Sequence, residues 1–310
     1  MKKLLIIGIS GLTGYKLAQL SINNFKVFGT FNRRAIKIKN CNIYQLDKTD
    51  KKKTAQLIKK INPNVIIDCS ALHNVDYCET HQEETRKVNV DAPRYIAEIC
   101  KKINAHMIYM STDYVYDGKA LQFTEESDTN PLNYYGLSKL MGEKEISNTG
   151  INYTIFRTSL IFGWNPHELS GISSSSGKSQ NYVIWAINKL RNGENLNIVN
   201  DQYSTPTFVD NLAKALLKIA ESETTGLFHI AGKNCLNRYD FTIKIAEIFD
   251  LNKELINSTT SDQFKQVAKR PMRCCLDVSK AEKILNLQFL NIEDALEKMK
   301  EQETANFNLG

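Results

Sequence analysis

The stretch KLLIIGISGLTG, residues 3–14, decides the expected fold of this chain. Its apolar run Leu4–Ile7 predicts a buried strand. Three glycines follow at a spacing of three residues, just before an amphipathic stretch: Gly8, Gly11 and Gly14. A Cβ in such a strand-to-helix turn would block the turn and keep the backbone away from a dinucleotide pyrophosphate, which rests on the helix N-terminus. The stretch therefore predicts a dinucleotide-binding βα unit at the start of the chain.

Short apolar runs continue to alternate with amphipathic stretches through the first half of the chain. Runs such as Val65–Cys69 are apolar almost throughout, which suits strands covered by helices on both faces. The alternation predicts an α/β fold, a Rossmann-type doubly wound parallel sheet. Further strands are expected at Lys26–Phe31, His106–Ser111, Tyr153–Arg157 and Gly226–Ala231, and helices at Leu12–Ser21, Ala55–Ile61, Asp91–Ile103 and Tyr135–Ile146.

The 310-residue length suits two lobes. We expect an NAD(P)-binding domain from residues 1–163 and 201–232, and a smaller C-terminal α/β substrate lobe from 164–200 and 233–302. Residues 164–180 are rich in glycine and serine without a period, and predict a loop that is either a linker or a cover for the substrate. Helices are expected beyond it at Tyr182–Arg191, Val209–Glu221, Tyr239–Phe249, Ser279–Leu285 and Ile292–Lys300.

Composition places the chain among folded globular proteins. Apolar residues make up 42% and charged residues 24% of it, which excludes a disordered or low-complexity protein. The formal net charge of +6 comes from scattered basic residues and is too small to indicate nucleic-acid binding. A mild basic excess does suit anionic small ligands such as phosphorylated cofactors.

The sequence shows no evident signal for export or membrane insertion. The opening MKKLLIIGIS imitates a signal peptide, but its apolar run is too short and continues into glycines. No apolar stretch reaches the roughly 18 residues that a membrane span needs. We therefore expect a cytoplasmic protein that binds neither membrane nor nucleic acid.

The cysteines and histidines favour neither a disulfide nor a metal site. Seven cysteines occur without a C-x-x-C spacing, and the adjacent Cys274 and Cys275 cannot readily bridge each other, so we expect free thiols in a reducing cytosol. No catalytic metal is expected, because the five histidines are dispersed without a pair at metal-ligand spacing. They are His73, His81, His106, His167 and His229.

The end of the second expected strand indicates which nicotinamide cofactor is preferred. An NAD-specific protein would place an acid there for the adenosine ribose, whereas this chain has Asn32, Arg33 and Arg34. Arginine can pair with a 2′-phosphate through two hydrogen bonds, which favours NADP, with NAD possible. Asp47 follows the third strand and could accept a hydrogen bond from the adenine amino group, while Asp50 is the natural N-cap of the next helix.

Tyr135 and Lys139 lie four residues apart, which places them on one face of the expected helix. A nearby ammonium favours the phenolate and should lower the pKa of the tyrosine, so that it can transfer a proton near neutral pH. Thr112 follows the strand His106–Ser111, at the edge where α/β sheets bind ligands. The three residues together predict a catalytic site.

These motifs occur in an order that resembles the extended short-chain dehydrogenases and, within them, the dTDP-4-dehydrorhamnose reductases. The similarity runs from Gly8 to about Leu285. It rests on the glycine turn and on Val75–Glu79, Val88–Val90, Ser111–Gly118, Pro131–Lys139, Arg157–Ser159, Asp201–Thr207, Arg270-Pro271 and Leu276-Asp277.

The resemblance implies reduction of the C4 ketone of dTDP-4-dehydro-L-rhamnose by NAD(P)H. In that reading Tyr135 donates the proton, Lys139 holds the nicotinamide ribose and keeps the tyrosine acidic, and Thr112 hydrogen-bonds the developing alkoxide. It implies a nucleotide-sugar substrate, and we expect a homodimer. The implied cofactor contacts are Ser10, Gly11, Leu12, Arg33, Asp47, Cys69, Ser70, Ala71, Tyr135 and Lys139.

Three positions depart from the related reductases and dehydratases. Leu160 stands where an aromatic residue often follows the Arg-Thr-Ser segment, and Cys69-Ser70-Ala71 stands where Asn-Ala-Ala is usual; both bear on the identity of the sugar. Tyr114 occupies the place of a catalytic acid in the sugar-nucleotide dehydratases, which favours reduction over dehydration.

Two other functions fit the same motifs. One is a non-catalytic, NADP-binding regulatory subunit similar to that of methionine adenosyltransferase, because such regulators can retain Thr112, Tyr135 and Lys139. The other is a reductase or epimerase that acts on a different nucleotide sugar.

Overall fold

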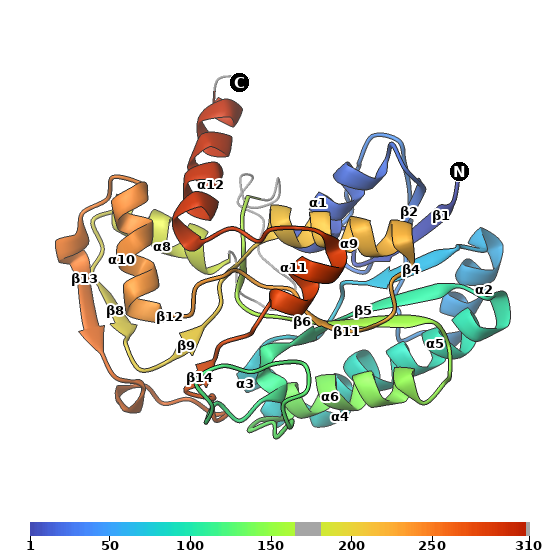
Figure 1. Cartoon of the computed structure of the whole chain (residues 1–310), viewed down its shortest axis with the longest axis horizontal. Helices are drawn as coiled ribbons and strands as arrows, with labels where there is room; N and C mark the ends of the chain where they lie inside the picture. The colour runs from blue at the N-terminus through green and yellow to red at the C-terminus, as the bar shows by residue number, and fades with distance from the viewer. Residues whose placement is uncertain (165–180, 308–310) are drawn as a thin grey trace.

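The computed structural model describes residues 1–164 and 181–307, and its centre is a seven-stranded parallel sheet (Figure 1). The strand order is β11-β6-β5-β4-β1-β2-β3, in which the chain reverses direction across the sheet between β1 and β4. This confirms the predicted doubly wound Rossmann-type sheet. The strands are β1 (Lys3–Ile7), β2 (Lys26–Phe31), β3 (Cys41–Gln45), β4 (Val65–Asp68), β5 (His106–Thr112), β6 (Tyr153–Thr158) and β11 (Gly226–His229).

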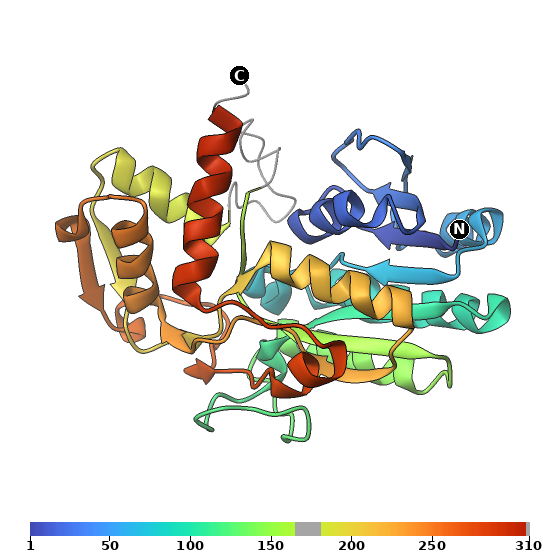
Figure 2. The same ribbon diagram turned by 45° about the horizontal axis from the view of Figure 1, so that its top comes forward.

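Alternating side chains of each strand belong to two separate cores, one on each face of the sheet. Helices cover both faces (Figures 1 and 2). Leu4 and Ile6 pack under α1 and α9, while Leu5 and Ile7 pack on the opposite face under α2 and α5. A strand buried on both faces must be apolar at every position, which explains its sequence. The helices of this part are α1 (Leu12–Ser21), α2 (Lys51–Ile61), α3 (Val75–Thr80), α4 (Gln82–Arg86), α5 (Ala92–Ile103), α6 (Tyr134–Ser147) and α9 (Val209–Ser222).

Side-chain caps fix where α2 and α6 begin. Asp50 accepts a hydrogen bond from the Lys53 backbone N–H at 2.9 Å and so caps α2, as predicted. Asn133 caps α6 in the same way through the Gly136 N–H at 2.9 Å. The second cap sets the first turn of the helix that carries Tyr135.

Helices α3 and α4 and a π-helical turn, Lys87–Asp91, precede α5 and are absent from the elements expected above. Asn89 in this turn is fully buried. Its side-chain amide donates to the Leu72 carbonyl at 2.9 Å and to the Ser138 hydroxyl at 3.0 Å. The π turn therefore joins the loop after β4 to α6.

A second group of elements surrounds its own apolar cluster beside the sheet (Figure 1). Its helices are α8 (Tyr182–Arg191), α10 (Arg238–Ile248) and α12 (Ile292–Phe307), and its short strands are β7 (Ile161–Phe162), β8 (Leu196–Val199), β9 (Tyr203–Ser204), β10 (Thr207–Phe208), β12 (Leu236–Asn237), β13 (Ile256–Thr259) and β14 (Arg273–Cys274). A separate cluster supports the proposed substrate lobe, whose boundaries stay a prediction. The suggested cover loop lies outside the described residues, apart from Trp164.

Residues 274–289 return the chain from the second cluster to the first, before α12 joins the second cluster again. Leu276 bridges to Phe123, and α11 (Ser279–Leu285) packs on β11 and α9. Six residues of this return segment are buried in the same core as β1: Cys274, Leu276, Val278, Ala281, Leu285 and Phe289. The sheet thus draws part of its cover from a segment far downstream of its first strand.

The expectation of free thiols throughout is wrong for two cysteines. Cys235 and Cys275 form a disulfide, with their Cα atoms 5.4 Å apart. They lie 40 residues apart in sequence, but β12 and β14 pair with opposite edges of β9 and so bring them together. A search for short cysteine spacings could not detect this pairing. The other five cysteines carry free thiols.

Within residues 1–164 and 181–307, no helix combines the length and apolar character that crossing a bilayer requires.

Candidate active site

The glycine turn lies at the edge of the sheet where the parallel strands end. The backbone N–H groups of Gly8 and Ile9 both donate to the Thr30 carbonyl, at 3.0 and 2.9 Å, which holds the turn against β2. A Cβ on Gly14 would overlap the Gly8 carbonyl oxygen, so α1 can approach the turn this closely only with glycine there. The structure therefore places the predicted turn and helix start as expected.

The N-terminus of α1 is open to a ligand. Gly11 is the N-cap residue, it is exposed, and it provides no side-chain acceptor for the N–H groups of the first helical turn. These donors, together with the positive end of the helix dipole, suit an anion. The residues present thus fit the pyrophosphate of a dinucleotide.

The other predicted cofactor residues follow neighbouring strands at this edge. Arg33 lies just after β2 and is exposed. The hydrogen bond with Glu84 raises the pKa of Tyr77, and the charge of Arg33 lowers it by a smaller amount. Asp47 follows β3, is exposed, and accepts from the Thr49 N–H and hydroxyl at 2.9 and 2.7 Å. The sheet order brings these strand ends together with the remaining predicted positions: Ser10, Leu12, Asn32, Arg34, Cys69, Ser70 and Ala71.

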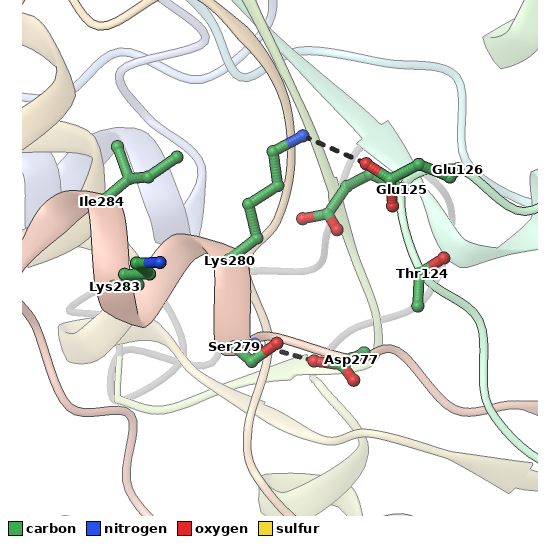
Figure 3. Close-up of a pocket in the computed structure, with 8 residues that line it drawn as sticks. All are labelled: Thr124, Glu125, Glu126, Asp277, Ser279, Lys280, Lys283 and Ile284. Atoms are coloured by element: carbon green, nitrogen blue, oxygen red, sulfur yellow. Dashed lines mark hydrogen bonds and ion pairs between the residues drawn. The ribbon is translucent and has the colours of Figure 1, made fainter.

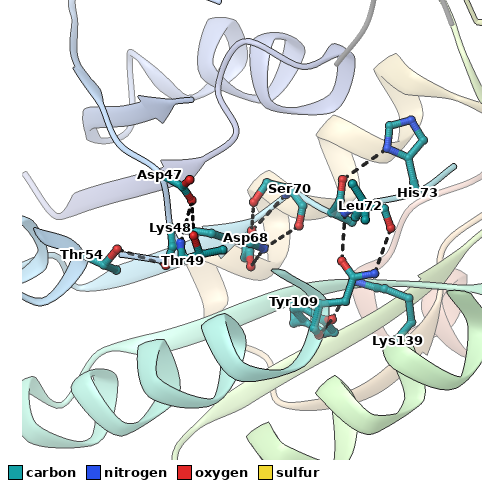
Figure 4. A network of polar contacts seen from close by, with 12 residues as sticks. Asp47, Lys48, Thr49, Thr54, Asp68, Ser70, Leu72, His73, Tyr109 and Lys139 are labelled. Carbon is teal, nitrogen blue, oxygen red and sulfur yellow. Dashed lines mark hydrogen bonds and ion pairs between the residues drawn. The ribbon is translucent and has the colours of Figure 1, made fainter. Parts of the chain in front are cut away.

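A buried ion pair that the sequence analysis did not identify lies at the end of β4 (Figure 4). The Lys48 ammonium donates to Asp68 Oδ2 at 2.8 Å and to the Ser70 carbonyl at 2.7 Å. Asp68 Oδ1 accepts from the Ser70 N–H at 3.0 Å and from its hydroxyl at 2.6 Å. The ammonium, the carboxylate and the serine hydroxyl therefore all have partners next to the predicted cofactor residues.

Thr112 and Tyr135 come together at the end of β5. The two side chains lie close enough together for the Thr112 hydroxyl to lower the pKa of Tyr135. The close approach depends on Gly136, because a Cβ there would overlap the Tyr114 carbonyl oxygen and push α6 away from the turn after β5. The Tyr114 ring lies edge-on to the Tyr135 ring, with centroids 6.0 Å apart. The structure therefore assembles two of the three predicted catalytic side chains.

Lys139, one helical turn after Tyr135, is 1% exposed. Its ammonium donates to the Tyr109 hydroxyl at 2.6 Å and lies 3.9 Å from the Tyr109 ring centre (Figure 4). The Tyr109 hydroxyl in turn donates to the Asn89 carbonyl at 2.9 Å. Lys139 is therefore oriented by β5 and the π turn, in addition to its place on α6.

The predicted lowering of the tyrosine pKa is wrong for this structure. Burial raises the pKa of Tyr135 above its ordinary value, and the nearby Thr112 hydroxyl offsets this only in part. Burial and the charge of Lys48 instead lower the pKa of Lys139 to about 7. Removal from water disfavours the charged form of either group.

Asp113 is a further titratable group beside Thr112. Its carboxylate accepts from the Thr112 hydroxyl at 3.1 Å and from the Ser159 hydroxyl at 2.5 Å. Burial raises the pKa of Asp113 to about 6, against the effect of these hydrogen bonds and of the Arg238 charge. Arg238 begins α10 and lies 5.0 Å from the Tyr182 ring centre, so the second cluster places a cation near this carboxyl.

Leu160, the departure noted above, follows Ser159 directly. It has a φ of 39°, a left-handed conformation that costs energy for a residue with a branched side chain. Its carbonyl accepts from the Thr207 N–H at 3.1 Å, and its side chain packs against the second cluster. The residue therefore marks the passage from the sheet to the second cluster.

A second buried ion pair lies on α6 one turn beyond Lys139. Glu143 accepts two hydrogen bonds from Arg157 of β6, at 3.0 and 2.6 Å, and a third from the Ser111 hydroxyl. Arg157 also donates to the Tyr116 hydroxyl at 2.7 Å, which contacts His229 at 2.7 Å. This network ties α6 to β5, β6 and β11.

The hollow drawn in Figure 3 lies apart from this edge, beside α11. An ion pair between Lys280 and Glu126, 3.7 Å long, spans part of it. None of the predicted site residues lines it. Its lining residues are Thr124, Glu125, Glu126, Asp277, Ser279, Lys280, Lys283 and Ile284.

Comparisons with known proteins cover nearly the whole chain. A family model described as RmlD substrate binding domain matches residues 1–305. The dTDP-4-dehydrorhamnose reductase of Aggregatibacter actinomycetemcomitans is 31% identical over 312 residues, covering 97% of this chain and 99% of the relative. The methionine adenosyltransferase 2 subunit beta of Bos taurus is 29% identical over 290 residues, covering 91% of this chain and 82% of the relative.

One solved structure shows the likeness in fold. The crystal structure of the dTDP-4-dehydrorhamnose reductase from Bacillus anthracis, in complex with NADP, matches with a TM-score of 0.82. The alignment covers 97% of this chain and 99% of the other at 23% identity.

Proposed function

The chain belongs to the RmlD substrate binding domain family, and on that premise we propose that it reduces the C4 ketone of a nucleotide sugar with NADPH. The substrate that we propose is dTDP-4-dehydro-L-rhamnose, and the product dTDP-L-rhamnose. The named relative from Aggregatibacter supports this choice. NADP is the proposed cofactor, with NAD as a second possibility.

One observation carries the proposal. The Thr112 and Tyr135 side chains lie close together at the end of β5, with Lys139 one helical turn away. They lie at the same edge of the sheet as the glycine turn and the open N-terminus of α1. A proton donor and a dinucleotide-binding turn at one sheet edge are what hydride transfer to a ketone requires.

Each of the three catalytic side chains has a proposed task. Bound NADPH would supply the hydride. Tyr135 donates its hydroxyl proton to the ketone oxygen, and Thr112 donates a hydrogen bond to that oxygen as negative charge develops on it. Lys139, when charged, holds the ribose hydroxyls and favours the phenolate that Tyr135 becomes.

The cofactor contacts are assigned to the sheet edge. The first turn of α1, with Gly8, Ser10, Gly11, Leu12 and Gly14, would hold the pyrophosphate. Asn32, Arg33 and Arg34 would hold the 2′-phosphate, and Asp47 the adenine amino group. The strand end Cys69, Ser70 and Ala71 would contact the remainder of the dinucleotide, together with Tyr135 and Lys139.

The experiment is NADPH oxidation by the purified chain with dTDP-4-dehydro-L-rhamnose and with a panel of other 4-keto nucleotide sugars. Tyr135→Phe should lower kcat at least about 100-fold, because it removes the proton donor, while the affinity for NADPH stays nearly unchanged. Tyr134→Phe, on the adjacent position of the same helix, is the matched control. Turnover by Tyr135→Phe close to that of the unaltered chain would remove Tyr135 from the mechanism.

A second function is supported by the relative from Bos taurus, a subunit beta of methionine adenosyltransferase 2. In that reading the chain is a non-catalytic regulatory subunit that binds NADP. It would bind NADPH with ordinary affinity and oxidise it with no member of the sugar panel. Saturable oxidation with a sugar other than dTDP-4-dehydro-L-rhamnose would instead indicate a reductase of another nucleotide sugar, and exchange of C4 configuration without net oxidation an epimerase.

Two further parts of the proposal concern the protein as a whole. We propose a cytoplasmic location and a homodimer. Light scattering coupled to size-exclusion chromatography would measure the second, and a mass close to the 35.3 kDa of one chain would contradict it.

A further inference from the structure

Lys48 stands in the loop between β3 and α2, and no motif or proposed role above uses it. Its side chain is 6% exposed and that of its partner Asp68 is 0% exposed. The ammonium has two acceptors, Asp68 Oδ2 at 2.8 Å and the Ser70 carbonyl at 2.7 Å (Figure 4). An apolar residue would be the ordinary choice for such a position, because burying a charge costs energy even when it is paired.

The contacts of Lys48 join two strand ends that the sheet itself keeps apart. In the strand order, β1 and β2 stand between β4 and β3. Lys48 follows β3 and reaches Ser70, which follows β4, and Ser70 packs against Gly8 of the glycine turn. Lys48 is also adjacent to Asp47, the proposed adenine contact. A single side chain therefore fixes the relative position of both ends of the proposed cofactor site.

The charges of the same ion pair also act on Lys139, the proposed catalytic lysine. The groups that act on the charge of Lys139 come from three directions: Lys48 from the β3–α2 loop, Asp68 and Cys69 from the end of β4, and Glu143 from α6. Tyr109 of β5 accepts the Lys139 hydrogen bond. The charge of Lys48 lowers the pKa of Lys139, and the charge of Asp68 raises it.

We propose that Lys48 is a positioning residue of the cofactor site: it holds the end of β4 against the glycine turn, and with Asp68 it balances the electric field at the Lys139 ammonium. The proposal rests on the proposed function only in treating Lys139 as the catalytic lysine. A purely structural ion pair would stabilise the fold without setting the charge of Lys139.

The two single variants separate these readings because their electrostatic effects have opposite signs. Lys48→Met leaves the Asp68 carboxylate without its partner near Lys139, so the pKa of Lys139 should rise by about one unit. Asp68→Asn leaves the Lys48 ammonium without its partner, so the pKa of Lys139 should fall by about one unit. The double variant removes both charges and should return the pKa to within about half a unit of the unaltered chain.

The measurement is a pH titration of ¹³C-labelled lysine side chains by NMR, with the Lys139 resonance assigned from Lys139→Met. NADPH affinity, followed by fluorescence in the same samples, should fall about tenfold in Lys48→Met because Ser70 loses an anchor. Lys16→Met breaks another lysine–aspartate pair, with Asp210 at 3.2 Å, and should change neither readout. The proposal would be overturned if the pKa of Lys139 moved in the same direction in both single variants, or if it moved in neither.

Lys48→Met leaves a buried carboxylate unpaired, and this variant is the one most at risk of failing to fold. In that event Asp68→Asn and the double variant carry the test, because the pKa of Lys139 must be lower in the first than in the second. Neither readout needs a sugar substrate. Absence of turnover on every sugar together with opposite shifts would therefore count against the proposed function and leave this inference standing.

Discussion

Two buried ion pairs each place a carboxylate whose charge acts on Lys139, and they differ in what surrounds them. Glu143–Arg157 has further partners around it: Ser111 of β5, Tyr116 in the segment after β5, and His229 of β11. Lys48–Asp68 directs its remaining hydrogen bonds to a single residue, Ser70, at the sheet edge. The first pair holds elements of the fold together, whereas the second ends at the proposed cofactor site. We infer that Glu143–Arg157 mainly stabilises the fold, because its further partners belong to other elements of the sheet, and that Lys48–Asp68 mainly serves the cofactor site, because its further partner is Ser70.

The largest expected effect tests the structural side of this comparison. Arg157→Met should lower the free energy of unfolding by about 3–5 kcal/mol, because it leaves the Glu143 carboxylate buried without a partner. Urea unfolding measures the loss. The double variant Arg157→Met with Glu143→Leu should recover much of the lost stability, because neither charge is then left buried alone. A loss below about 1 kcal/mol in the single variant would mean that the network does not hold the sheet to α6.

Burial of Lys139 should make the stability of the chain depend on pH. Burial lowers the pKa of Lys139 from 10.5 to about 7, so between these pH values the unfolded chain binds a proton that the folded chain lacks. The stability of the unaltered chain should therefore fall as the pH drops across this window, and level off below it. Lys139→Met removes the buried charge. The difference in the free energy of unfolding between Lys139→Met and the unaltered chain should therefore change by a few kcal/mol in favour of the variant as the pH falls from 10.5 to about 7.

Thermal unfolding across this pH range checks that prediction. Lys144→Met on the same helix is the matched control, because its side chain is exposed. A constant difference between Lys139→Met and the unaltered chain across the whole range would show that Lys139 keeps its ordinary pKa despite its burial.

Removing the Tyr116 hydroxyl should have the smallest of these effects on the Glu143–Arg157 network. Tyr116→Phe keeps the ring, which stacks on Phe123 at 4.3 Å, but removes the oxygen that contacts both Arg157 and His229. We expect a loss of about 1–2 kcal/mol in the free energy of unfolding, with no change in NADPH affinity. Calorimetry and a fluorescence titration measure the two quantities. A change in NADPH affinity larger than the change in stability would place this network in the cofactor site as well.

The sheet and its helices could be predicted from sequence because their signals are local. The apolar run before Gly8 and the four-residue spacing of Tyr135 and Lys139 are each contained in one element. The cap by Asp50 lies three residues from its donor. Helices α3 and α4 were missed because five or six residues give too little periodicity to detect.

The polar interior of the site could not be predicted in the same way. Lys48 and Asp68 lie 20 residues apart, and Tyr116 and His229 lie 113 apart, so no local pattern marks either contact. The pKa directions depend on depth of burial, which only the packed structure sets. For Tyr135 the four-residue spacing from a lysine was visible in the sequence, but the cost of removing the phenolate from water was not.

The return of the chain from the second cluster to the first has a consequence for synthesis on the ribosome. The parallel sheet receives its last strand only at Gly226–His229, and one of its two cores is completed by side chains as late as Phe289. A nascent chain that has emerged only as far as α8 would therefore expose one face of its strands. We infer that the N-terminal nucleotide-binding part cannot reach its final state ahead of the rest, and that a molecule truncated before α11 would be a target for chaperones and proteases.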